Sequence, residues 1–190
     1  MIHECVITTH CADGSVHIAP MGVHDADDGL IIAPFKPSTT LNNVLREGFA
    51  VINYVDDVRI IAGCLTGRWL WPTHAAQRIP CHRLEAALAH TELALRRVHA
   101  DPQRPRLFCH IVHEANHAPF RGFNRAQMAV LEAAILVSRL HMLPAQKIDQ
   151  ELEYLRIGLE KTAGPREREA WEWLMQHVAE YRHKHQEAYA

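Results

Sequence analysis

The sequence predicts an α+β protein, with a β-barrel-like body over residues 1–120 and a helical unit over residues 121–190. Short β-branched and apolar runs fill the first part and are separated by turn signals rich in Asp, Gly and Pro. After Gly122, apolar residues recur at helical spacing, and Pro144 and Pro165 divide this part into three helices. A chain of 190 residues is long enough for one domain with a hydrophobic core and an appended unit.

The body is expected to contain short strands and one short helix. The run 30–33 is wholly apolar, so this strand is expected to be buried. A helix over residues 41–47 is expected to end at Gly48, because glycine favours helix C-termini. The segment 82–99 has a helix-like composition, but its short-strand context favours a long β-hairpin with residues 107–113. The strands expected before this hairpin cover residues 5–9, 16–23, 30–33, 49–55 and 60–65.

Three amphipathic helices are expected to follow the body. They are predicted over residues 125–142, 145–162 and 167–181, with a proline between each pair. Apolar residues form a stripe on the last two, at Ile148, Leu152, Leu155 and Leu159 and at Trp171, Leu174 and Val178.

Composition and charge indicate a globular protein with neither a nucleic-acid nor a membrane partner. Apolar residues make up 48% of the chain, charged residues make up 22%, and the net charge is -2. No apolar run approaches the ~20 residues of a membrane span, and the N-terminus does not resemble a signal peptide. The five cysteines lack C-x-x-C spacing, which is typical of reduced thiols. We therefore expect a cytoplasmic protein.

The segment Pro37-Ser38-Thr39-Thr40 places three hydroxyl residues directly before the expected helix over 41–47. Side-chain oxygens and free backbone N–H groups converge at a helix N-terminus and can bind a phosphate there. The alternative is that these hydroxyls only cap the helix. No G-x-G-x-x-G or Walker loop is present, so a nucleotide would bind outside those two frameworks.

Further candidate phosphate ligands lie within the helix that follows this segment and far along the chain. Asn42 or Asn43 would add an amide donor from within the helix. Arg125 would add a guanidinium, which pairs with phosphate in a fork geometry. The alternative for Arg125 is a solvated loop that enters a helix at Asn124, a plausible N-cap.

The run Ala19-Pro20-Met21-Gly22 lies inside the strand expected over 16–23. Proline removes a ladder donor, and glycine allows a ligand to approach the backbone. The run is therefore either a strand edge on which a flat ring lies or a β-bulge at a barrel corner.

The chain contains 15 histidines, and residues 113–117 match the zinc motif H-E-x-x-H. On a helix, His113 and His117 would share one face, and Glu114 would activate a zinc-bound water. The preceding residues 107–112 indicate a strand, however, and a proline follows the motif closely. We therefore predict no metal site and keep a zinc hydrolase as a less favoured alternative.

Taken in order, the segments 19–22, 37–40 and 48–53 resemble the flavin-reductase-like FMN-binding split-barrel family. The chain is most similar to a branch of it known as a domain of unknown function. In that branch a segment similar to residues 119–126 leads into C-terminal helices, and the resemblance extends to about Trp173. It implies an FMN-binding split β-barrel with a C-terminal three-helix unit packed on it.

The resemblance also implies a homodimer that binds FMN at the subunit boundary. The family's S-x-T phosphate element falls on Ser38 and Thr40, and its ring-contacting strand falls on residues 19–22. The chain departs from the family at His10-Cys11, where an asparagine is more usual. This departure affects the expected ring contacts and not the fold.

The resulting hypothesis is an FMN-binding flavoprotein, a flavin-dependent oxidoreductase or flavin reductase-like protein that uses NAD(P)H or another electron donor. The isoalloxazine would perform the chemistry, so no catalytic residue is predicted. Asn53 is a candidate hydrogen-bonding residue beside the site, with a buried structural role as the equal alternative. A related flavin or a haem in the same groove is a further possibility. A non-catalytic flavin carrier or assembly partner is the alternative function.

Overall fold

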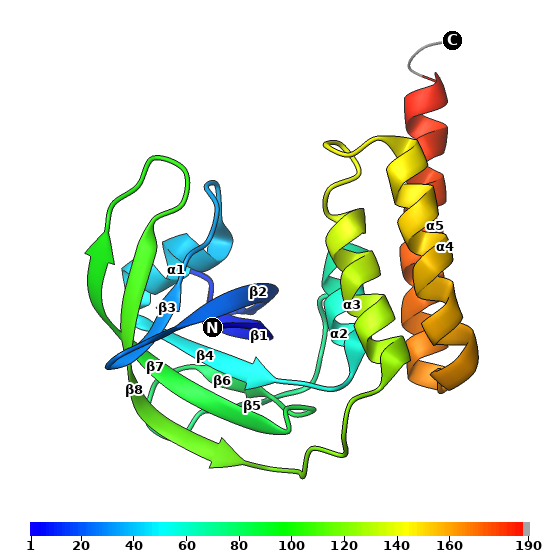
Figure 1. The fold of residues 1–190 in the computed structure, drawn as a ribbon. Helices are drawn as coiled ribbons and strands as arrows, with labels where there is room; N and C mark the ends of the chain where they lie inside the picture. The colour runs from blue at the N-terminus through cyan, green and yellow to red at the C-terminus, as the bar shows by residue number, and fades with distance from the viewer. Residues whose placement is uncertain (188–190) are drawn as a thin grey trace. The chain divides into compact units, whose positions relative to one another are not determined.

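The computed structural model describes residues 1–187, which form two compact units. The barrel unit comprises residues 1–55 and 70–120, and the helical unit comprises residues 56–69 and the chain from residue 121 onward. Figure 1 shows the strands and the helices. The strands are β1 (Ile2–His10), β2 (Val16–Ala26), β3 (Gly29–Ile32), β4 (Phe49–Tyr54), β5 (Thr73–Ala75), β6 (His82–Leu84), β7 (Ala89–His99) and β8 (Arg106–Asn116). The helices are α1 (Thr39–Glu47), α2 (Val58–Leu65), α3 (Arg125–Val137), α4 (Ala145–Thr162) and α5 (Pro165–Glu187).

Six antiparallel strands close into a barrel in the order β1-β2-β3-β8-β7-β4, with β4 paired to β1 (Figure 1). Side chains alternate between the two faces of each strand, so every second residue points into the barrel. The α+β class and the barrel architecture expected from the sequence are confirmed. The interior is filled by apolar side chains, among them Ile7, Ile32, Ile52, Leu93 and Leu107.

The predicted β-hairpin is confirmed, as β7 pairs with β8 along almost their full length. The turn between them is shaped by Asp101, whose carboxylate accepts hydrogen bonds from the N–H groups of Gln103, at 2.8 Å, and Arg104. The hairpin begins later than expected, at Ala89, because residues 82–84 form the separate strand β6.

The strand predicted over residues 60–65 is wrong, because this apolar run forms α2. Asp57 caps the helix and accepts a hydrogen bond from the Arg59 N–H at 3.2 Å. Ile60 and Ala62 are buried in the helical unit. A short run of buried β-branched residues fits a strand or a buried helix equally well. Burial of this run in the helical unit is therefore what favours the helix.

The helix predicted over residues 41–47 is confirmed as α1, which begins two residues earlier at Thr39. Gly48 ends it as predicted, with a left-handed backbone (φ 79°) and its N–H donated to the Val44 carbonyl at 2.9 Å.

The helical unit contains the three predicted C-terminal helices together with α2. Asn124 caps α3 and accepts a hydrogen bond from the Ala126 N–H at 2.8 Å, as the sequence indicates. α3 ends at Val137, earlier than expected, and α4 spans the predicted residues. Among the described residues, no helix is both long enough and apolar enough to cross a bilayer.

Residues 70–88, here called the cover segment, lie between α2 and β7 in the chain and carry the two-stranded sheet β5–β6. Ile79 and Cys81 of this segment pack against Val51, on the outer face of β4. The barrel sheet is therefore covered on part of its outside as well as filled within. The polar contacts under this cover are described with the site below.

Candidate functional site

The start of α1 carries the hydroxyl residues that the sequence singles out. Ser38 is the N-cap, with an extended backbone, and its Oγ accepts a hydrogen bond from the Leu41 N–H at 3.2 Å. Ser38 is half-buried, Thr39 is exposed and Thr40 is buried, with 1% of its surface accessible. Capping is therefore observed. It does not exclude anion binding, because the Ser38 hydroxyl acts as the acceptor in the cap and can still donate its own proton.

The electrostatics of this helix end favour an anion. The first N–H groups of a helix, those of Thr39 and Thr40, have no intrahelical acceptor, and the helix dipole places partial positive charge there. The first turn contains no acidic side chain to compensate this charge. Lys36 lies two residues before the cap and donates from Nζ to the Asp101 carbonyl at 3.1 Å. Pro37, between the lysine and the cap, is exposed.

The run 19–22 lies on a stretch of β2 that has a neighbouring strand on one side only. β2 pairs with β1 in an unbroken register, with Pro20 opposite Val6, so the bulge considered from the sequence is not formed. β3 pairs only with residues 23–26 of β2. Within residues 1–187, the other side of residues 16–22 therefore lacks a paired strand. Proline is tolerated at such an edge because one side needs no ladder bonds.

Asn43 is buried and its amide is engaged by the protein. Its Nδ2 donates to Thr9 Oγ1 at 2.9 Å, and its Oδ1 accepts from the Arg46 guanidinium at 3.2 Å. These contacts join α1 to the end of β1. In this arrangement Asn43 fixes the position of the helix whose N-terminus is the candidate site.

Asn53 is fully buried in β4 and links three elements. Its Nδ2 donates to the Val6 carbonyl and to Thr8 Oγ1, both at 3.1 Å, and its Oδ1 accepts from the Leu84 N–H at 2.7 Å. These contacts are those of the structural alternative, in which Asn53 holds the cover segment to the barrel.

Arg125 is the first residue of α3 and lies in the helical unit, whereas Ser38 and Thr40 lie in the barrel unit. Within its own unit, Arg125 lines a hollow between α3 and α4 together with Met128 and Tyr154. Its predicted contact with a phosphate stays a prediction.

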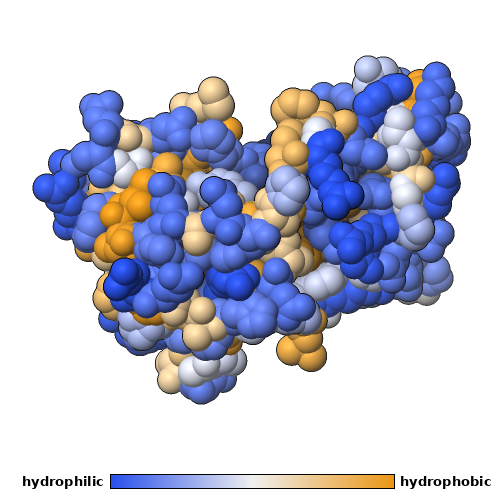
Figure 2. Space-filling model, turned by 90° about the horizontal axis from the view of Figure 1, so that it is seen from below, coloured by the Kyte–Doolittle hydropathy of each residue, from blue (hydrophilic) through white to orange (hydrophobic). Residues whose placement is uncertain are grey.

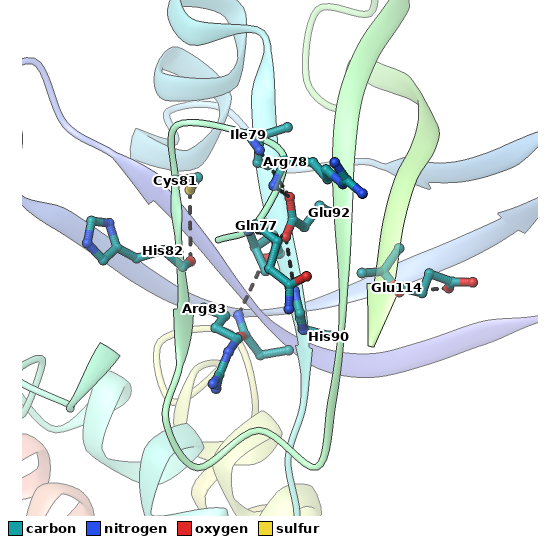
Figure 3. Close-up of polar contacts among 12 residues, drawn as sticks. Gln77, Arg78, Ile79, Cys81, His82, Arg83, His90, Glu92 and Glu114 are labelled. Carbon is teal, nitrogen blue, oxygen red and sulfur yellow. Dashed lines mark hydrogen bonds and ion pairs between the residues drawn. The ribbon is translucent and has the colours of Figure 1, made fainter. Parts of the chain in front are cut away.

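A second group of polar side chains lies on the outer face of β7 and β8, beside the cover segment (Figure 3). The side chains of His90 and Glu92 are 0% exposed, and His90 Nε2 lies 3.2 Å from Glu92 Oε1. On its other side, His90 Nδ1 lies 2.8 Å from His117 Nε2, with the two rings stacked. His113 on β8 is the register partner of Glu92 on β7.

The Glu92 carboxylate holds the cover segment through its backbone (Figure 3). Oε1 accepts from the Gln77 N–H at 2.6 Å, and Oε2 accepts from the N–H groups of Arg78 at 2.8 Å and Ile79 at 3.1 Å. Burial alone would raise the pKa of Glu92, but these backbone bonds and the His90 contact outweigh it and lower the pKa below its ordinary value. The buried carboxylate therefore stays charged.

The H-E-x-x-H match lies at the end of β8, so the prediction that it is not helical is confirmed. Neighbouring residues of a strand point to opposite faces. His113 stands opposite Glu92, whereas the Glu114 carboxylate accepts from Thr91 Oγ1 at 2.9 Å. The helical zinc-hydrolase arrangement, with two histidines on one face and an adjacent general base, is not formed.

Family models of known proteins match most of the chain. The DUF447 N-terminal domain, described as a protein of unknown function, matches residues 3–118, and the DUF447 C-terminal region matches residues 124–176. The chain belongs to the DUF447 family. No curated protein matches it. The two matched regions of this DUF447 protein meet near residue 120, where its barrel unit ends.

Solved structures share the fold. An FMN-bound DUF447 protein from Methanosarcina mazei has a TM-score of 0.81 at 20% identity and covers 93% of this chain and 94% of its own. An NADH:FAD oxidoreductase from Streptomyces globisporus has a TM-score of 0.54 at 9% identity, covering 65% of this chain and 81% of its own. A flavoredoxin from Methanosarcina acetivorans has a TM-score of 0.53 at 12% identity, covering 61% and 69%. The split-barrel fold expected from the sequence is therefore confirmed.

The sequence analysis missed His90 and Glu92, which are the centre of the outer-face cluster. One signal was available: Glu92 is an acidic residue inside a strand, between Thr91 and Leu93. A charged residue in a covered strand is rarely buried without dedicated partners. The partners, however, come from the cover segment, whose approach could not be read from the chain.

Proposed function

We propose that this DUF447 protein binds FMN in its barrel unit and acts as a flavin-dependent oxidoreductase of the flavin reductase-like type. The observation that carries the proposal is the N-terminus of α1, where Ser38 caps a helix whose first turn has no acidic residue. The fold supports the same ligand, since a protein of the same family and fold is described as FMN-bound.

The residues present fit the phosphate of FMN. In the proposed site, the Ser38 and Thr39 hydroxyls and the first N–H groups of α1 hold the phosphate, with Thr40 as the inner member of the set. The flavin ring lies along residues 19–22, where β2 has a half-buried, unpaired edge. Asn43 positions α1 in this proposal, and Asn53 serves the barrel structure.

When bound, FMN supplies hydride or electron transfer, and the protein supplies position and electrostatics. Polar backbone along the β2 edge orients the ring, and the helix dipole neutralises part of the phosphate charge. The same unpaired edge would allow a second copy of the chain to complete the site, so the proposed form is a homodimer. NAD(P)H is the proposed electron donor.

Replacing Ser38 tests the phosphate assignment and separates it from capping. Aspartate is as good an N-cap as serine, so Ser38→Asp keeps α1 stable but adds a negative charge at the phosphate position. We expect this variant to lose FMN affinity and to keep whatever affinity the protein has for riboflavin, which lacks the phosphate. Ser38→Ala combined with Thr40→Ala should weaken FMN binding by about 2–4 kcal/mol, at ~1–2 kcal/mol for each charge-assisted hydrogen bond.

Binding is measured by titrating each flavin and following the quenching of its fluorescence. Thr66→Ala in the helical unit is a matched control, because its hydroxyl bonds to Ala62, Gly63 and Arg68, which all belong to that unit. Equal FMN affinity of wild type and Ser38→Asp would overturn the site. Oxidation of NAD(P)H in the presence of FMN then distinguishes a reductase from a flavin carrier, which is the alternative function.

A further inference from the structure

The outer-face cluster contains three metal-ligating side chains in one place. A ring nitrogen of His90, one carboxylate oxygen of Glu92 and a ring nitrogen of His113 all lie within 4.8 Å of one another. His90 and Glu92 are two residues apart on β7, so they share a face, and His113 is the register partner of Glu92 on β8. The cluster is therefore fixed by the pairing of two long strands and not by a loop.

One of these three side chains carries a buried nitrogen that has no hydrogen-bond partner. His113 Nε2 is buried, and it makes no hydrogen bond within the part of the chain that the structure describes. Buried polar atoms are nearly always satisfied, so such an atom needs an explanation. The ring of His113 meets the ring of His90 edge-on, with centroids 5.8 Å apart. The ring that carries this unsatisfied nitrogen thus lies in the cluster.

The other two groups already have the supporting contacts that metal ligands use. A ligating histidine normally engages a second group through its other ring nitrogen, and ligating carboxylates are themselves hydrogen-bonded. His90 Nδ1 lies 2.8 Å from His117 Nε2, and the Glu92 carboxylate accepts backbone N–H bonds from the cover segment. These contacts hold both side chains in place while His90 Nε2 and Glu92 Oε1 face each other.

We propose that His90, Glu92 and His113 bind a divalent transition-metal ion, with zinc as the best match. Two imidazoles and one carboxylate suit zinc, and three protein ligands leave a fourth tetrahedral position for water. The ion would replace the proton that lies between His90 Nε2 and Glu92 Oε1, which would be released to solvent, and it would satisfy His113 Nε2. It would tie β8 to β7 and, through Glu92, to the cover segment.

This site differs from the H-E-x-x-H zinc site considered from the sequence. Glu114 takes no part in it, because its carboxylate faces Thr91, and His117 acts as a supporting residue and not as a ligand. The proposal does not depend on flavin binding, since it uses other strands and other residues of the barrel unit.

Metal binding to the full chain tests the site. The protein is stripped with a chelator, dialysed and titrated with Co²⁺, whose tetrahedral complexes absorb visible light, and Zn²⁺ is then added as a competitor. We expect stoichiometric Co²⁺ binding that zinc displaces, and a melting temperature that rises with zinc. His113→Ala should weaken binding by about 100-fold or more, and His117→Ala by ~10–100-fold, the range seen for supporting residues.

His110→Ala is the matched control, because His110 is an exposed histidine on the same strand and lies outside the cluster. It should bind metal like the wild type. His113→Ala is expected to fold, since the Nε2 it removes makes no hydrogen bond, and circular dichroism checks this; His113→Gln serves as a second variant. An absence of stoichiometric binding by the wild type, or equal binding by the folded His113 variants, would overturn the proposal.

Discussion

The barrel unit has two polar sites, and they are built in opposite ways. At the start of α1, Ser38, Thr39 and Thr40 are consecutive in the sequence and reach the surface at Thr39. In the outer-face cluster, His90, Glu92 and their partners come from two strands and the cover segment, and the side chains of His90 and Glu92 are buried. A backbone N–H that loses its acceptor can turn to water in the first site, whereas the Ile79 N–H that bonds to Glu92 in the second site is buried. The comparison indicates that the buried site contributes stability and the exposed site is free to bind ligand.

Removing the Glu92 carboxylate should give the largest effect. Glu92→Ala leaves the N–H groups of Gln77, Arg78 and Ile79 without their acceptor, so we expect the free energy of unfolding to fall by about 3–5 kcal/mol. Urea denaturation in the presence of a chelator measures this without any metal contribution. Glu85→Ala, which removes an exposed carboxylate of the cover segment, should change stability by less than ~0.5 kcal/mol. If Glu92→Ala lowered the free energy of unfolding by less than ~0.5 kcal/mol, as a surface substitution does, the result would contradict this comparison of the two sites.

Asn53→Ala should have the next largest effect, because it removes the amide that joins β1, β4 and β6. We expect a loss of about 2–4 kcal/mol, since the Leu84 N–H is left buried without an acceptor. FMN affinity, measured well below the melting temperature, should be unchanged. A stable variant with weakened FMN binding would instead place Asn53 in the flavin site.

The Ser38 cap should contribute less than either buried group. Ser38→Ala is expected to lower stability by about 1 kcal/mol, because an exposed helix end can exchange its lost cap for water. Ser38→Asp should restore that stability by capping the helix again. Thermal or urea unfolding of the three proteins checks this order, and a Ser38→Ala loss as large as that of Glu92→Ala would remove the contrast between the sites.

The smallest expected effect concerns pH and a histidine of the cover segment. Burial lowers the pKa of His82, and the neighbouring His10, whose Nε2 lies 2.8 Å away, lowers it further. The unfolded chain therefore takes up the proton first as the pH falls below ~6.5, and stability decreases from that pH downward. His82→Gln should reduce the decrease measured by urea unfolding between about pH 7 and pH 5. His99→Gln, at an exposed position, should leave it unchanged.

Local signals in the sequence were sufficient to predict the helices whose boundaries are set by characteristic capping or helix-breaking residues. Gly48 ended α1, Asn124 began α3, and the proline at 144 separated α3 from α4, each through a contact made within a few residues. The strands of the barrel followed from their alternation. The hydroxyl cluster at Ser38 belongs to the same class, because a helix cap is defined by its own chain neighbours.

Features that depend on distant contacts were not predictable. The run at 60–65 became a helix because Asp57 capped it and the helical unit buried it, and no local preference distinguished this from a strand. The cluster of His90, Glu92 and His113 required the register of β7 and β8 and the approach of the cover segment. The zinc motif in the sequence indicated the correct stretch of chain with the wrong geometry.

The surface of the molecule is mostly hydrophilic in the view of Figure 2, with hydrophobic patches between polar regions. On such a surface the unpaired edge of β2 has a further consequence. An exposed strand edge is a template on which another extended chain can add and grow into an aggregate. Pro20 lies within that edge, and a residue without an N–H interrupts any continuous ladder there. Pro20 thus disfavours edge-to-edge polymerisation of this protein in concentrated solution.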